Sequence, residues 1–128
     1  MRRVQRMALL GAESTGKSWL AKALADVIQM RGHAVSTIDE VLREWCEREG
    51  RTPQPHEQMG IALAQARAVE QVTQGWVISD TTPIMTAVYS DMLFNDKSLY
   101  PMALAHQALF DTTLITGLDL PWVADGLQ

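Results

Sequence analysis

The sequence contains only one cysteine, Cys46, so no disulfide bond can form within the chain. A lone thiol suits a reducing compartment. The sequence also lacks an apolar run that approaches the roughly 20 residues of a membrane-spanning helix. Near the N-terminus, Gln5 and Arg6 interrupt the apolar residues, so no secretory signal peptide is expected. These absences predict a soluble, cytoplasmic protein without a membrane span.

Positive charge is scarce as well. The 11 Lys and Arg residues are outnumbered by 15 Asp and Glu, which gives a formal net charge of −4 at pH 7. A field of this sign repels nucleic acid and anionic membrane, so neither is expected as a partner. With 47% hydrophobic residues, the chain can bury one sizeable core. Any affinity for phosphate must therefore come from a local, pre-organised site.

Short apolar runs alternate with longer helical patterns along the chain, which is typical of a parallel α/β sheet. Strands are expected at residues 6–10, 34–38, 76–80 and 112–116. One helix is expected from residue 17 to a stop at Gly32, and further helices at 40–49, 57–74, 83–94 and 101–110. The residues after 116 form an expected loop.

The segment GAESTGKS, at residues 11–18, matches the phosphate-binding pattern G-x-x-x-x-G-K-[ST] in full and lies between an expected strand and an expected helix. Gly11 and Gly16 allow backbone angles that point N–H groups at a phosphate, and the helix adds its positive N-terminal end. Lys17 would reach the β- and γ-phosphates of ATP, and the Ser18 hydroxyl would bind Mg²⁺. The expected ATP-binding residues are Gly11, Ala12, Glu13, Ser14, Thr15, Gly16, Lys17 and Ser18.

The expected fold class is therefore α/β, a three-layer P-loop NTPase sheet with parallel strands in a kinase-like order. A fourth strand without a following helix is an unfinished βα unit, and it leaves an unprotected sheet edge. We expect residues 1–128 to form a single domain that is cut short at its C-terminus, with the last strand and helix missing. The alternative is that something else covers this sheet edge.

Asp80 ends the apolar strand WVISD. In a P-loop protein this is the position of the Walker-B carboxylate, which meets the Mg²⁺ hydration shell. The alternative is an aspartate that caps the helix expected to begin near Pro83. Because a complete P-loop precedes Asp80, we favour the metal-binding interpretation.

A second charged cluster, Asp39-Glu40 with Arg43 and Glu44, follows the second expected strand. In open α/β sheets, ligands bind beyond the carboxyl ends of the strands, so this cluster should face the same crevice as the P-loop. A carboxylate of this cluster could accept the proton of an acceptor hydroxyl while Arg43 steadies a substrate group, and the sequence does not decide which carboxylate, Glu40 or Asp80, is the base. The alternative is a solvated helix face on which these charges pair with one another.

Four segments together resemble one family, the ribosylnicotinamide kinase domain of bacterial NadR-type proteins. They are GAESTGKSWLAKALA, DEVLREW, SDTTPIMTAVYSDMLF and LITGLDLPWVADGLQ, in the family's order and spacing. Many families share the first segment, whereas REW, SDTT and PWVADG are more specific. The resemblance implies a kinase that uses ATP and Mg²⁺ to phosphorylate a nucleoside 5′-hydroxyl, that of nicotinamide riboside.

The resemblance also implies roles for individual residues. Taken one at a time, the aromatic residues among them are better interpreted as core packing. The implied catalytic residues are Lys17, Glu40 and Asp80, with Ser18 and Asp80 as metal ligands. The implied substrate-binding residues are Glu40, Arg43, Trp45, Tyr89, Trp122 and Asp125.

The sequence departs from the family's pattern after Gln128, where the family continues into an arginine-bearing lid. An arginine at the transferred phosphoryl group is worth about 10³–10⁵ in rate, so its loss would weaken catalysis. Three alternatives therefore stay open. They are a kinase for another nucleoside, a regulatory module that binds ATP without transferring phosphate, and a fragment without function.

Overall fold

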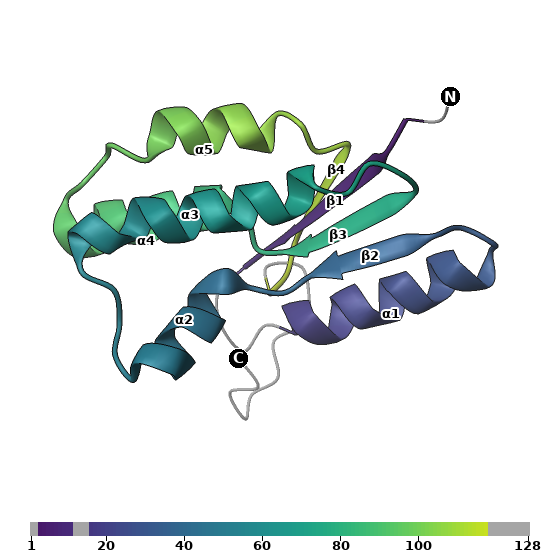
Figure 1. The fold of residues 1–128 in the computed structure, drawn as a ribbon, viewed down its shortest axis with the longest axis horizontal. Coiled ribbons are helices and arrows are strands. Elements are labelled where there is room, and N and C mark those ends of the chain that lie inside the picture. Colours follow the sequence, from purple (N-terminus) through teal and green to yellow (C-terminus); the bar gives the residue numbers. More distant parts are fainter. Residues whose placement is uncertain (1–2, 12–15, 118–128) are drawn as a thin grey trace.

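The computed structural model describes residues 3–11 and 16–117, which form a parallel sheet covered by helices on both faces (Figure 1). The strands are β1 (Gln5–Leu10), β2 (Val35–Ile38), β3 (Trp76–Asp80) and β4 (Thr112–Ile115). The helices are α1 (Lys17–Met30), α2 (Val41–Glu49), α3 (Pro55–Glu70), α4 (Pro83–Phe94) and α5 (Tyr100–Gln107). Among these helices, none is long and apolar enough to cross a membrane.

The strands lie in the order β2-β3-β1-β4, and every neighbouring pair is parallel. The predicted α/β class, parallel sheet and kinase-like order are confirmed. Strands β1 and β3 are neighbours, and their register pairs Leu9 with Asp80. The carboxyl end of β3 therefore lies beside the point where the chain leaves β1 for the Gly-rich loop. In the described sheet β4 is an edge strand, since it pairs only with β1.

The core contains three clusters of buried residues. One lies among α3, α4 and α5, and the other two pack on opposite faces of the sheet. Leu9 and Ile78 are buried against Ala21 of α1. On the opposite face, Val77 packs with Val69 of α3. Helices α4 and α5 lie on that same side with α3 (Figure 1), so the fold has the three layers predicted. Helix α2 lies beyond the carboxyl end of β2 and contacts α3.

Helix α3 differs from the helix predicted at 57–74, because it begins two residues earlier and ends at Glu70. The predicted helix started after Pro55, whereas proline is well tolerated in the first turn of a helix. Glu57 stabilises this start by accepting a 2.8 Å hydrogen bond from the Gln54 N–H and two from the Arg51 guanidinium. These bonds lower the pKa of Glu57 to about 2, and the interaction with Arg51 has the largest effect.

The turn after α3 leads into β3 through Gly75, which has a φ of 73°. A Cβ atom at this position would lie 2.5 Å from the backbone oxygen of Ala34. Both facts require glycine here, because this φ is unfavourable for other residues and the space is already occupied. The close approach keeps β2 and β3 paired at the start of both strands.

His106 of α5 gives the fold a predicted dependence on pH. Its side chain is buried, and neither ring nitrogen makes a hydrogen bond within the described residues. Burial lowers the pKa of His106 below 6.5, although Glu70, with Oε2 3.4 Å from Nδ1, opposes the shift. The unfolded chain therefore binds a proton more readily than the folded protein. The free energy of unfolding should fall as the pH drops from about 7 through the region below 6.5.

Urea denaturation at about pH 7 and at about pH 5.5 measures this effect. His106→Leu removes the titrating ring and should reduce the difference between the two pH values. An equal pH dependence in the wild type and the variant would show that another group is responsible.

Candidate functional site

The two glycines of the GAESTGKS segment both adopt positive φ angles, 147° at Gly11 and 86° at Gly16. Gly16 is the N-cap of α1, which starts at Lys17. The first N–H groups of a helix have no partner within it, so the start of α1 is a favourable place for an anion. The predicted ATP-binding residues Ala12, Glu13, Ser14 and Thr15 lie outside the described residues.

Lys17, Ser18 and Asp80 meet at the carboxyl ends of β1 and β3. The Ser18 hydroxyl donates a 2.6 Å hydrogen bond to Oδ2 of Asp80. Lys17 Nζ lies 4.0 Å from Oδ1 of Asp80, and both side chains are almost completely buried. Oδ1 accepts no hydrogen bond from the described residues. Asp80 does not cap α4, since Thr82 holds that position.

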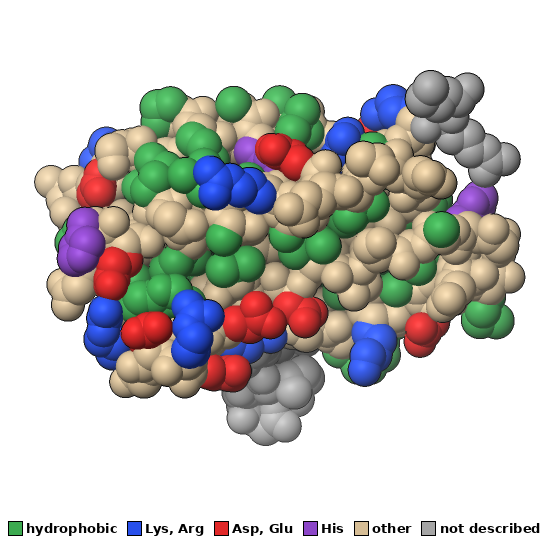
Figure 2. All heavy atoms as spheres, in the orientation of Figure 1, with side chains coloured by type: hydrophobic (Ala, Val, Ile, Leu, Met, Phe, Trp, Pro, Cys, Tyr) green, Lys and Arg blue, Asp and Glu red, His purple; other side chains and the backbone are tan. Residues whose placement is uncertain are grey.

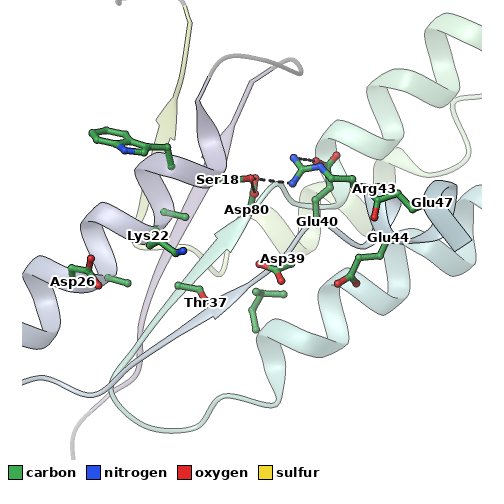
Figure 3. A pocket seen from close by; sticks show the side chains of 14 residues that line it. Ser18, Lys22, Asp26, Thr37, Asp39, Glu40, Arg43, Glu44, Glu47 and Asp80 are labelled. Atoms are coloured by element: carbon green, nitrogen blue, oxygen red, sulfur yellow. Dashed lines mark hydrogen bonds and ion pairs between the residues drawn. The ribbon is translucent and has the colours of Figure 1, made fainter.

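Arg43 connects Glu40, in the charged cluster that follows β2, to Ser18 and Asp80 (Figure 3). Its Nη2 donates to Oε1 of Glu40 at 3.0 Å, and its Nη1 donates to the Ser18 hydroxyl, also at 3.0 Å. Glu40 is the N-cap of α2 and its side chain is mostly buried, whereas about half of the Arg43 side chain is exposed. Residues from β1–α1, β2–α2 and the end of β3 therefore form one connected polar site.

A groove of about 690 Å³ runs beside this network, between α1, the end of β2 and α2. Carboxylates dominate its charged side chains, and the space-filling view shows Asp and Glu side chains gathered between α2 and α1 (Figure 2). The acidic lining residues are Asp26, Asp39, Glu40, Glu44, Glu47 and Asp80, and the basic ones are Lys22 and Arg43. The groove therefore favours a cationic or neutral ligand next to the start of α1.

The structure does not place Trp45 or Tyr89, two of the predicted substrate-binding residues, at this groove. Trp45 lies on α2, where the Arg51 guanidinium carbon is 4.9 Å from the centre of its ring. Tyr89 lies on α4, partly buried, and neither residue is among those that line the groove. Trp122 and Asp125, the other predicted substrate-binding residues, lie outside the described residues.

The sequence interpretation missed the contribution of α1 to the groove. Lys22 and Asp26 follow Ser18 at intervals of four residues, so all three share one helical face and line the groove. Trp19, which is 75% exposed, also lines it. The four-residue spacing from Ser18 was the signal that could have identified this face.

Ser18 and Asp80 are suited to a Mg²⁺ ion that keeps most of its other ligands from water and phosphate. The buried, unbonded Oδ1 of Asp80 is an oxygen that such a cation would satisfy. Within the described residues, no three His, Cys, Asp or Glu side chains are grouped so that they could hold a metal ion. The described residues therefore do not form a metal site in which His, Cys, Asp and Glu side chains supply three or more ligands.

Comparison with known proteins gives one family match. Residues 6–128 match the model of a family described as AAA domain. No curated protein matches the chain. Among solved structures, a gluconokinase from Sinorhizobium meliloti 1021 is 12% identical with a TM-score of 0.47, over 99% of this chain and 89% of that one. The protein APE1195 is 19% identical with a TM-score of 0.42, over 89% and 86% of the two chains.

Proposed function

The chain belongs to the AAA domain family, and we propose that it is an ATP-dependent small-molecule kinase acting on a nucleoside 5′-hydroxyl, that of nicotinamide riboside. The observation that carries this proposal is the continuous network of Asp80, Ser18, Arg43 and Glu40. It connects the phosphate-binding end of the site directly to the groove. A donor phosphate and an acceptor hydroxyl held at the two ends of this network would be neighbours.

Each residue of the network has a distinct part in phosphoryl transfer. Lys17 and the N-terminus of α1 would neutralise charge on the ATP phosphates. When bound by Ser18 and Asp80, Mg²⁺ would add further neutralisation of the phosphate oxygens. Glu40, which lies at the groove, would orient the acceptor hydroxyl and accept its proton. Glu40 holds the Arg43 guanidinium beside the Ser18 hydroxyl. Negative charge on the transferred phosphoryl group would develop there, and Arg43 would stabilise it.

The charge of the groove supports this acceptor. Nicotinamide riboside carries a fixed positive charge on its pyridinium ring, and carboxylates outnumber basic side chains in the groove lining. The exposed indole of Trp19 offers a flat surface for such a ring at the same place. An anionic acceptor would be repelled by the same side chains.

An acceptor panel tests the proposal. The protein is incubated with ATP and Mg²⁺ together with nicotinamide riboside, uridine, adenosine or gluconate, and ADP release and the phosphorylated product are measured. We expect turnover with nicotinamide riboside at a kcat/KM at least about tenfold above that of the uncharged nucleosides, because of the acidic groove. Gluconate should not react.

The other outcomes separate the competing functions. Turnover with an uncharged nucleoside alone would overturn the acceptor but keep the kinase. Binding of ATP without transfer to any acceptor would favour a regulatory nucleotide-binding module instead.

A further inference from the structure

Gln65 lies on α3, and its buried side-chain amide forms hydrogen bonds both to the β2–α2 junction and to the end of β3. Only 2% of the residue is exposed. Its Oε1 accepts a 2.8 Å hydrogen bond from the Val41 N–H at the start of α2. Its Nε2 donates to the backbone oxygen of Asp39 at 3.3 Å and to the Ser79 hydroxyl at 3.1 Å.

These partners flank the residues that the proposed reaction uses. Asp39 and Val41 stand on either side of Glu40, and Ser79 immediately precedes Asp80. One side chain on α3 therefore holds the β2–α2 junction against the end of β3. It adds to the direct pairing of the two strands, whose register places Ile38 opposite Ser79.

The Ser79 hydroxyl extends this connection by donating a 2.6 Å hydrogen bond to the backbone oxygen of Thr81. Thr81 has a φ of 75°, a left-handed conformation that is costly for a β-branched residue. A bond that supports this conformation helps to keep Asp80 pointed at Ser18 and Lys17. The hydrogen bonds from Gln65 through Ser79 thus extend to Thr81, the strained residue that follows Asp80.

From this geometry we infer that Gln65 is a positioning residue of the kinase reaction, an inference that rests on the proposed function. It is not among the residues that line the groove, so it acts through Glu40, Arg43 and Asp80 rather than on substrate. Removing its amide leaves the Val41 N–H and the Asp39 carbonyl without their bonds to Gln65, which loosens the junction. Misplacement of reacting groups by about 1 Å can cost about 10²-fold in rate.

The test compares Gln65→Met with Gln58→Met. Gln58 lies on the same helix, is equally buried, and its Oε1 has no hydrogen-bond partner among the described residues. We expect Gln65→Met to raise the acceptor KM and lower kcat, each by about tenfold, with ATP affinity changed less than about twofold. Gln58→Met should retain both acceptor parameters. A general loss of stability would change the ATP affinity as well as the acceptor kinetics, so it would not produce this pattern.

A second variant guards against a failure of Gln65→Met to fold. Ser79→Ala removes one arm of the same connection with a small change in volume, and should raise the acceptor KM by about threefold. In the double variant the two effects should not add, because both interrupt one path. Wild-type acceptor kinetics in Gln65→Met, or additive effects in the double variant, would overturn the positioning role.

Hydrogen exchange separates this inference from the proposed function. In Gln65→Met the amide of Val41 should exchange at least about tenfold faster than in wild type and in Gln58→Met, with or without kinase activity. Faster exchange in a protein that phosphorylates no acceptor would reject the proposed reaction and the positioning role of Gln65 with it. That result would still support the hydrogen-bond connection from Gln65 to the β2–α2 junction. An active wild type with unchanged exchange and kinetics in Gln65→Met would reject the inference alone.

Discussion

Asp80→Asn is expected to lower kcat/KM by about 10²–10³-fold while the protein stays folded. Asparagine has nearly the same shape and can still accept the hydrogen bond of the Ser18 hydroxyl, which is 2.6 Å long in the wild type. It carries no charge, however, and it replaces one carboxylate oxygen by an NH₂ group. That group cannot coordinate a cation and would not attract Lys17, whose Nζ lies 4.0 Å from Oδ1.

The measurement is steady-state kinetics over a range of Mg²⁺ concentrations, with circular dichroism to verify the fold. Asp80→Asn should need more Mg²⁺ to reach half of its reduced maximal rate. Asp96→Asn is the matched control, because its carboxylate follows α4 and bonds to the Ser98 N–H, away from the network. A folded Asp80→Asn with wild-type kcat and Mg²⁺ dependence would remove Asp80 from the site.

The meeting of Ser18 and Asp80 could be predicted because it depends on features that are local in sequence. A complete phosphate-binding motif follows one apolar strand, and an aspartate ends another. In a parallel sheet the carboxyl ends of all strands lie at one edge, so such residues converge without knowledge of the detailed packing. The order β2-β3-β1-β4, which makes β3 the direct neighbour of β1, then brings them within hydrogen-bond distance.

Contacts that depend on the direction of a loop side chain were harder to predict, even between residues close in sequence. The resemblance implies a substrate-binding role for Trp45. In the structure Arg51 lies over its ring, and nothing in the spacing of the two residues indicates that contact. The start of α3 depends on Arg51 as well, through its two bonds to Glu57. A side chain in a loop is free to turn in many directions, so the sequence pattern does not determine which partner it finds.

Gln65 shows a signal that was present in the sequence but not used. Ile61 and Val69 of this helix are apolar and buried. Gln65 lies four residues after one and four before the other, so it belongs to the same face. A polar side chain on a buried face must find hydrogen-bond partners or pay a large desolvation cost, and this marks it as a structural connection.

Lys17→Met is expected to have an effect at least as large as that of Asp80→Asn, and it should act on ATP binding as well as on turnover. The charge balance of the site explains why. The groove lining is mostly acidic, and the chain carries a net charge of −4, so a triphosphate finds little attraction from the protein as a whole. Attraction must come from the start of α1, from Arg43 and from Lys17, whose ammonium group is buried.

Methionine keeps the length and apolar character of the Lys17 side chain but removes this charge. In a buried site with little water to screen it, the loss should lower kcat/KM by about 10³-fold and weaken ATP binding by at least about tenfold. Isothermal titration with ATP and Mg²⁺ measures the binding, and initial rates measure the turnover. Lys97→Met is the control, since Lys97 is exposed and pairs with Asp91 outside the site. If folded Lys17→Met binds ATP as tightly as the wild type, the segment at residues 11–18 is not the phosphate-binding loop, and the kinase proposal loses its foundation.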